Sequence, residues 1–484
     1  MKVSADLSQN IATLHTLLPV DASFDLVTRD LYLGRTRAYW IGVNGFCKTE
    51  VLQQIFSDLQ NPLFTEDDTI EDLIRYMNAK IGFAQVEAES DWDKLIKNLL
   101  SGPSLLFVEG FDRALIIDAR SYPTRGVAEP DAERITRGSR DGFVETLLFN
   151  ANLIRRRVRS PGLTFAMHSV GEQSRTDVAV AYLEEGVNKE LLKYLNAKLD
   201  SLRISSLTMG SKSLEELLVP YRWWNPLPSV QYTERPDVAC SYLLEGHILI
   251  LVDNSPLALI LPCTVFQFTQ SVEDYYKSPT VGSYFRLVRL ACIPVSLFLM
   301  PVFLLITAYY PQAAVRWQLV GDIPGKWQMI FYVLAVEFVL DLFKYAGALS
   351  PGRFSGSLAV VGGLLIGDMA VSLNWASAEV LFYGAVTLLA TMSLSSPELG
   401  DALRVYRILL LVFTALGGLW GFAVGVALTL LSVLTTPTFG GMSYFWPLYP
   451  WNGKALRRLL FRSPTAKAQP GTVWSRGPVH RKES

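Results

Sequence analysis

The sequence predicts two α/β domains in tandem, followed by an all-α membrane domain with several transmembrane helices. Two observations lead to this fold class. A strand–turn–helix pattern occurs twice in the N-terminal part, and uncharged apolar segments gather after residue 285. The chain has 484 residues, with 44 basic and 45 acidic side chains. This length fits several domains, and the near neutrality gives no sign of a nucleic-acid partner.

The repeated pattern defines the core of each predicted α/β domain. Residues 37–59 read RAYWIGVNGFCKTEVLQQIFSDL, and residues 176–199 read TDVAVAYLEEGVNKELLKYLNAKL. Each stretch fits a strand, a turn at Gly45 or Gly186, and then an amphipathic helix. Two related domains explain this similarity, and the alternative is a chance likeness between generic strand–turn–helix units.

A second pair of similar segments follows these stretches. We expect a β-hairpin that turns at Glu109-Gly110 in the first copy and at Glu245-Gly246 in the second. The first domain is therefore assigned to residues 1–165 and the second to residues 166–284. The first twenty residues contain Asp6 and His15 and lack a long apolar core, so we expect both domains to stay in the cytoplasm.

A basic helix is predicted between the repeats and is assigned to the first domain. It begins near Gly142 and ends before Pro161. Its four arginines form a solvated face, or they bind anionic lipid headgroups or acids of a neighbouring subunit; they are Arg155, Arg156, Arg157 and Arg159. Arg155, Arg156 and Arg157 are therefore candidates for assembly, as are Arg134, Arg137, Arg140 and Asp141 of the preceding loop, where salt-bridge docking is expected. Two further polar loops are expected to dock the α/β domains against the membrane domain; their candidate residues are Glu234, Arg235, Asp274 and Tyr275.

Motifs for catalysis or cofactors are missing from the sequence. There is no phosphate-binding GxxxxGK[ST] loop and no GxSxG turn. The four histidines are far apart, and the four cysteines form no CxxC pair, so neither a metal site nor a disulfide framework is expected. Asp118, Glu245 and Asp253 fall at predicted turns, where acids are ordinary residues. We expect a protein that is not an enzyme and uses no cofactor.

Residues 285–436 are predicted to form the membrane domain, and residues 437–484 a basic cytoplasmic tail. Segments of about 20 apolar residues are long enough to span a bilayer. The five candidates are residues 285–310, 327–346, 354–375, 379–396 and 406–435. Pro294 and Pro301 are expected to kink the first of them.

The charge pattern places both termini on the cytoplasmic side. Arg286 and Arg289 precede the first segment, and the tail is rich in lysine and arginine. Both termini inside require an even number of crossings, whereas there are five candidates. We therefore expect four spans plus one re-entrant or interfacial helix, namely residues 327–346, with the glycine-broken final segment as the other choice.

The segment 327–346 carries a polar stripe. Glu337, Asp341 and Lys344 fall on one face of a helix. Charges at membrane depth are costly, so they face protein or water rather than lipid. The stripe is either a set of ion pairs that locks helices together or a polar seam along an ion path.

Asp368 lies in a glycine-rich segment with Gly362, Gly363 and Gly367. Small residues let helices approach closely. The carboxylate is either a salt-bridge partner or, repeated around a symmetric oligomer, an acidic ring that favours cations.

Several stretches resemble the GerA family of spore germination proteins. They include EPDAERITRGSRDGFVETLLFNANLIRRRVRSPGL, YTERPD, FQFTQSVEDYY and AVVGGLLIGDMAV. The resemblance is to the A subunits of germinant receptors and extends roughly over residues 24–462. It implies a multi-pass protein of the spore inner membrane that forms a homo-oligomer, a pentamer by analogy, and takes part in early ion release.

The resemblance also suggests partners and a pore. Some members work beside B and C subunits, and others resemble amplifiers that act with a small accessory membrane protein. Residues 357–371 are expected to be the pore helix, although receptor A subunits commonly carry glutamine where Asp368 stands. We therefore expect an oligomeric ion channel, or a channel-like subunit, that promotes potassium or cation release and amplifies the germinant response. The alternatives are a non-conducting scaffold that clusters receptors and a secondary transporter.

Overall fold

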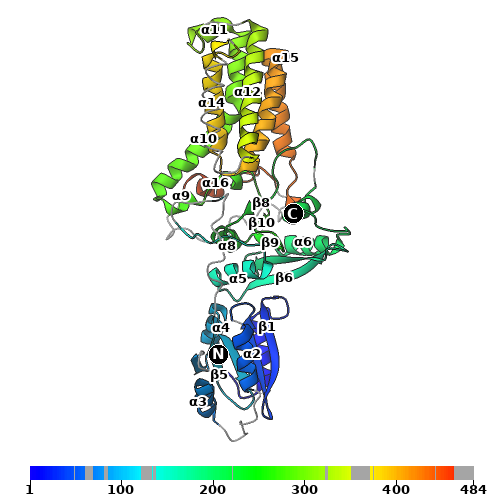
Figure 1. Ribbon diagram of the computed structural model, residues 1–484, viewed down its shortest axis with the longest axis vertical. Coiled ribbons are helices and arrows are strands. Elements are labelled where there is room, and N and C mark those ends of the chain that lie inside the picture. The colour runs from blue at the N-terminus through cyan, green and yellow to red at the C-terminus, as the bar shows by residue number, and fades with distance from the viewer. Residues whose placement is uncertain are drawn as a thin grey trace.

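The computed structural model describes residues 1–47, 49–59, 69–80, 85–120, 133, 138–220, 222–321, 325–349, 371–373, 375–441 and 443–462. These residues form three tiers along the long axis of the molecule (Figure 1). A first sheet domain lies at one end, a second sheet domain lies in the middle, and a helical bundle lies at the other end.

The first domain is a five-stranded antiparallel sheet in the order β1-β2-β4-β5-β3. Its strands are β1 (Leu26–Leu33), β2 (Thr36–Val43), β3 (Gln85–Glu89), β4 (Ser104–Val108) and β5 (Ala114–Asp118). Its helices are α1 (Leu7–Leu17), α2 (Thr49–Leu59), α3 (Ile70–Lys80) and α4 (Trp92–Ser101). Side chains alternate along β2, so that Ile41 packs beneath α1 and α4, while Trp40 packs beneath α2 and α3.

The second domain repeats this topology. Its sheet order, β6-β7-β9-β10-β8, is the same as that of the first sheet when the strands are matched in sequence order. In both sheets the third strand along the chain, β3 or β8, lies at one edge beside the fifth. The strands are β6 (Leu163–Val170), β7 (Thr176–Leu183), β8 (Gln231–Thr233), β9 (Ile248–Val252) and β10 (Ala258–Leu261). The helices are α5 (Leu147–Arg157), α6 (Lys189–Ser201), α7 (Ser211–Leu218) and α8 (Pro236–Leu244). The predicted pair of α/β units is therefore present.

Two predictions in this region were wrong. Glu245 and Gly246 end helix α8 instead of turning a hairpin, and the turn between β9 and β10 follows Val252. The basic helix α5, assigned above to the first domain, has its apolar face on the second domain and reaches the first through Arg155, which pairs with Asp25. Together with α8 it covers one face of the second sheet, because Leu147, Ala151 and Ile154 form an apolar stripe at helical spacing.

The bundle contains α10 (Pro279–Tyr309), α12 (Lys326–Leu349), α14 (Ala378–Met392) and α15 (Pro397–Thr435), which run along the long axis (Figure 1). Shorter elements flank it: η1 (Gln267–Thr269), α9 (Glu273–Tyr276), α11 (Pro311–Arg316), η2 (Phe439–Gly441) and α16 (Gly453–Leu460). Among the described residues, α10 and α15 are long and apolar enough to cross a membrane, and α14 is a shorter apolar helix. Part of the predicted tail is folded, since Phe439 packs into the core of the second domain.

Helix α15 is a helical hairpin. Gly418 has φ +55° and ψ −130°, a left-handed conformation that favours glycine. After it the chain turns back, so that a Cβ added to Gly425 would lie 3.6 Å from the Cα atom of Leu410. Tyr406 likewise hydrogen-bonds Ser432 near the other end. Residues 397–417 and 419–435 are therefore two antiparallel arms.

Candidate functional site

The polar stripe of α12 faces the first arm of α15. Glu337 pairs with Arg407, Asp341 pairs with Arg404, and Lys344 pairs with Asp401. The two helices run in opposite directions, so residues spaced by three or four positions on each of them meet in order. The result is a ladder of three ion pairs, called here the charge ladder, in which acids and bases of the two helices are complementary.

Exposure increases along the charge ladder toward the second α/β domain. The Glu337 and Arg407 side chains are 4% and 1% exposed, whereas those of Lys344 and Asp401 are 30% and 60% exposed. The middle pair is intermediate, with Arg404 at 11% and Asp341 at 30%. Because a buried charge without a partner is costly, the deepest pair contributes most to keeping the helices in register.

Arg407 joins four helices at one point. Its Nη2 donates to Glu337 Oε2 of α12 at 3.0 Å, and its Nη1 donates to the Ser296 carbonyl of α10 at 2.8 Å. Nη1 also reaches Thr391 Oγ1 of α14 at 3.4 Å. The guanidinium presents its donors in a rigid fork, which suits such a multiple contact. By contrast, Arg404 Nε lies 2.9 Å from Asp341 Oδ1 without hydrogen-bond alignment, so that pair is held by charge alone.

Comparison with known proteins identifies the family. The model for the Bacillus/Clostridium GerA spore germination protein matches residues 13–471. The chain belongs to the GerA family of spore germination proteins. It is 34% identical to stage V sporulation protein AF of Bacillus subtilis (strain 168) over 463 residues, which cover 93% of this chain and 92% of that protein.

Other GerA proteins align over similar lengths. Spore germination protein KA of Bacillus subtilis (strain 168) is 28% identical, over 96% of this chain and 85% of that protein.

A solved structure, the N-terminal domain of the A subunit of the Bacillus megaterium spore germinant receptor GerK3, is 25% identical to this chain. It covers 54% of this chain and 96% of that chain, with a TM-score of 0.42.

In this GerA chain, the predicted basic cluster is divided between the interior and the surface. Arg155 is fully buried and pairs with Asp25 of the first domain, with its Nε 2.7 Å from Asp25 Oδ2. Arg157 pairs with Asp141 at 2.5 Å, whereas Arg156 and Arg140 are exposed. A solvated or lipid-binding face was therefore wrong for Arg155. Its partner is an acid, as the third alternative expected, but an acid of the first domain of the same chain, so Arg155 connects the two α/β domains.

Glu234 and Arg235 bind Glu133 and Ser139, which precede α5 in the sequence, to the second domain. The buried Arg235 binds Asp237 through Nη2 at 2.8 Å and also donates to the carbonyls of Glu133 and Ser139. The Glu234 amide donates to Glu133 Oε2 at 2.9 Å. Burial raises the pKa of Glu133, the group that receives this bond.

Asp274 lies where the second domain meets the base of the bundle. Its carboxylate accepts two hydrogen bonds from Arg289, at 3.0 and 3.1 Å, and lies 3.4 Å from Arg286 Nε. Arg286 also donates to the Leu459 carbonyl of α16, and its guanidinium lies over the ring of Tyr275. Asp274 and Tyr275 therefore connect α9, α10 and α16.

We expect Asp274→Asn to lower the free energy of unfolding by about 2–3 kcal/mol, because it leaves two largely buried arginines beside a neutral group. The adjacent Glu273, whose side chain is 36% exposed and 3.8 Å from Lys277, provides the matched control. Glu273→Gln should cost about 0–1 kcal/mol. Unfolding of both purified variants checks this, and equal effects would contradict the role given to Asp274.

Other candidates have structural partners or lie outside the described residues. Asp118 binds Arg120, and Asp253 accepts from the Leu147 amide at the start of α5. His247 hydrogen-bonds Gln267, and burial lowers its pKa to about 3, which keeps the ring neutral near pH 7. The following candidates fall outside the described part: Arg134, Arg137, Gly362, Gly363, Gly367 and Asp368.

Sequence reasoning missed the partners on α15. Asp401, Arg404 and Arg407 recur at helical spacing and carry charges opposite to those of Lys344, Asp341 and Glu337. This complementary order was the available signal. Because the final apolar segment begins at residue 406, Asp401 and Arg404 resemble ordinary flanking charges in the sequence.

Proposed function

We propose that this GerA chain is a multi-pass subunit of a homo-oligomeric ion channel in the spore inner membrane, with its two α/β domains in the cytoplasm. It would promote release of potassium or other cations early in germination and amplify the germinant response. The observation that carries the proposal is a membrane-length bundle with buried charges in a chain that matches the GerA family almost end to end.

Aromatic side chains support a bilayer around the bundle. Near α11, exposed aromatics gather at the helix ends: Tyr310, Trp317, Trp327 and Trp375. At the opposite end of α12, Tyr345 is 67% exposed. Trp327 and Tyr345 are 18 positions apart, or about 27 Å along a helix, which is close to the thickness of the hydrocarbon core. Tryptophan and tyrosine favour the two membrane–water interfaces.

The hairpin at Gly418 removes the need for a re-entrant helix. The proposed crossings are α10, α12, the predicted segment 354–375, α14 and the two arms of α15. Six crossings leave both termini on one side, in agreement with the charge pattern. This proposal replaces the expectation that residues 327–346 stay out of the membrane.

We assign conduction to residues 357–371, with Asp368 as the candidate cation-selective carboxylate, and assign the charge ladder to structure. Each ladder charge has an opposite partner within the chain, so it presents less free charge to an ion path. In a pentamer, Asp368 would form an acidic ring. A small accessory membrane protein and other germination proteins are the proposed partners.

Potassium release from germinating spores tests this assignment. We expect Asp368→Asn to slow release while protein level and oligomer size stay normal. The matched control is Asp401→Asn, which neutralises an acid that is 60% exposed at the end of the ladder, and which should leave release unchanged.

A non-conducting scaffold is the second candidate function. Large apolar side chains on the outer faces of α12 and α14, such as Phe338 at 64% and Phe382 at 62% exposure, offer contacts for clustering with other chains. Unchanged release in Asp368→Asn spores with an intact oligomer would favour this scaffold, and saturable, substrate-coupled uptake would favour a transporter.

A further inference from the structure

The second α/β domain carries an aromatic loop beside the end of the bundle. The loop follows α7 and contains the sequence Pro220 to Pro228, PYRWWNPLP. The Asn225 amide donates to the Arg222 carbonyl at 2.9 Å, so residues 222–225 form a tight turn. Trp223 and Trp224 occupy its tip and are 85% and 47% exposed.

Hydrogen bonds fix this turn to the end of α15. Arg222 Nη1 donates to the Thr435 carbonyl at 2.9 Å, and Asn225 Nδ2 donates to Thr436 Oγ1 at 2.9 Å. Tyr406 of the first arm donates to Asn225 Oδ1 at 3.1 Å. The loop therefore has a fixed position along the bundle axis.

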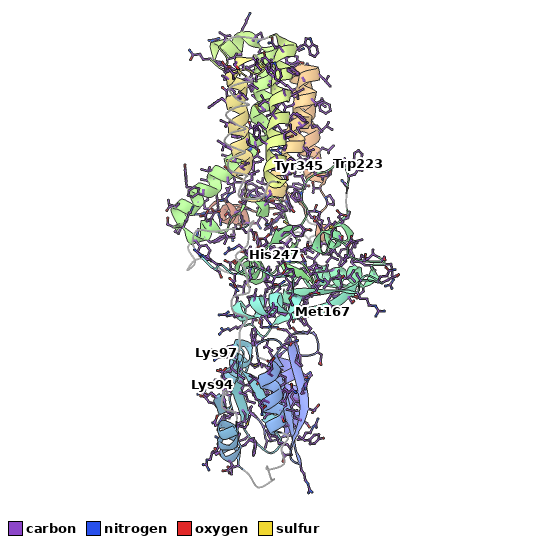
Figure 2. All side chains as sticks on the ribbon, in the orientation of Figure 1. Lys94, Lys97, Met167, Trp223, His247 and Tyr345 are labelled. Carbon is purple, nitrogen blue, oxygen red and sulfur yellow. The ribbon has the colours of Figure 1, made fainter. Side chains whose placement is uncertain are left out.

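That position coincides with one edge of the apolar surface. On the second arm of α15, Leu431 and Leu434 are 56% and 60% exposed, and the arm ends at Thr435. Trp223 lies at the level of Tyr345, the exposed aromatic near the end of α12 (Figure 2). The tryptophans thus continue an exposed apolar face, and the cation of Arg222 lies beside them, 5.7 Å from the ring of Trp224.

We propose that Trp223 and Trp224 insert into the headgroup region of the cytoplasmic leaflet and anchor the second α/β domain to the bilayer. This inference rests on the proposed membrane crossing. Indole rings favour the interface because one edge is apolar and the N–H group stays hydrated. A nearby arginine adds attraction to anionic lipid. The domain would then contact the membrane through its own loop as well as through α10 and α15.

Lipid quenching of an attached fluorophore tests the inference on the full chain. An NBD probe is placed on Trp223→Cys, or on Trp224→Cys as a second variant, and the protein is reconstituted in vesicles of phosphatidylcholine and phosphatidylglycerol. The unsubstituted chain, whose four cysteines are buried or half-buried, gives the labelling background. Two matched positions complete the set: Phe338→Cys midway along α12, 64% exposed, and Tyr32→Cys in the first domain, 60% exposed.

We expect lipids that carry a quencher near the headgroup to reduce NBD emission at position 223 more than lipids with a deep quencher. The order should reverse at position 338, and position 32 should respond only to aqueous iodide. Strong iodide quenching at 223 with a normal response at 338 would overturn the anchor alone. Protection at 223 from both iodide and lipid would indicate a protein contact and would also overturn it. Loss of lipid quenching at 338 would instead contradict the membrane crossing.

Discussion

Replacing Arg407 with methionine is expected to lower the free energy of unfolding by about 3–5 kcal/mol, the usual cost of removing one partner from a buried ion pair. The Glu337 side chain is only 4% exposed, so its carboxylate would remain buried without a cation. The Ser296 carbonyl and the Thr391 hydroxyl would also lose a donor. Unfolding of the purified protein in lipid–detergent micelles measures this loss.

The double variant Glu337→Met with Arg407→Met separates charge from packing. Replacing a whole buried pair by apolar side chains of similar volume is often nearly neutral. We therefore expect the double variant to recover most of the stability lost in the single one. At the exposed end of the ladder, Asp401→Asn should cost about 0–1 kcal/mol. A double variant as unstable as the single one would mean that the helix junction needs the Arg407 contacts to α10 and α14 more than it needs charge balance.

The α/β part of the fold was predictable because its signals are local. A short apolar run at β2 or β7, glycine at the following turn and an amphipathic helix all lie within about 25 residues, so the pattern can be seen in a short window of sequence. The prediction of a hairpin at Glu245-Gly246 was wrong because it, too, relied on local signals alone. Tyr242 and Leu243 fit a strand as well as the last turn of α8, and only their packing against α5 decides between the two.

Only the α12 side of the charge ladder could be predicted from the sequence. Charges within an apolar segment are conspicuous, so Glu337, Asp341 and Lys344 were found from spacing alone. Their partners lie 57 to 70 positions away, and that pairing depends on how the helices pack. The reversal at Gly418 is similar: the Gly417-Gly418 pair is visible in the sequence, whereas the positive φ that folds α15 on itself is a property of the packed bundle.

The basic neighbours of Arg155 hide its buried position in the sequence. Three consecutive arginines suggest a solvated surface. However, Leu147, Ala151 and Arg155 follow one another at intervals of four, so the third falls on the buried face of α5 while Arg156 points outward. Helical spacing, applied to the charged residues as well as the apolar ones, would have separated them.

The second large expected loss of stability concerns the buried ion pair between the two α/β domains, Arg155 with Asp25. Asp25→Asn should destabilise the junction by about 3–5 kcal/mol, because Arg155 and Asp25 are both fully buried. Further hydrogen bonds link the segment around Asp25 to strand β6 of the second domain. Ser23 Oγ donates to Asp25 Oδ1 at 2.6 Å and accepts from the Phe165 amide, while the Phe24 amide donates to the Phe165 carbonyl. Loss of the charge pair should therefore release this backbone pairing as well.

Hydrogen exchange can locate the effect. In the Asp25→Asn variant, amides in peptides that contain Phe24 and Phe165 should exchange faster, while Ile250 in the central strand β9 stays protected, because the second sheet keeps its own core. Arg156→Gln, one position along the same helix and exposed, is the matched control and should leave both peptides unchanged. Faster exchange throughout β9 would show that Asp25 supports the second domain itself, and unchanged exchange at Phe24 and Phe165 would show that apolar packing alone holds the two domains together.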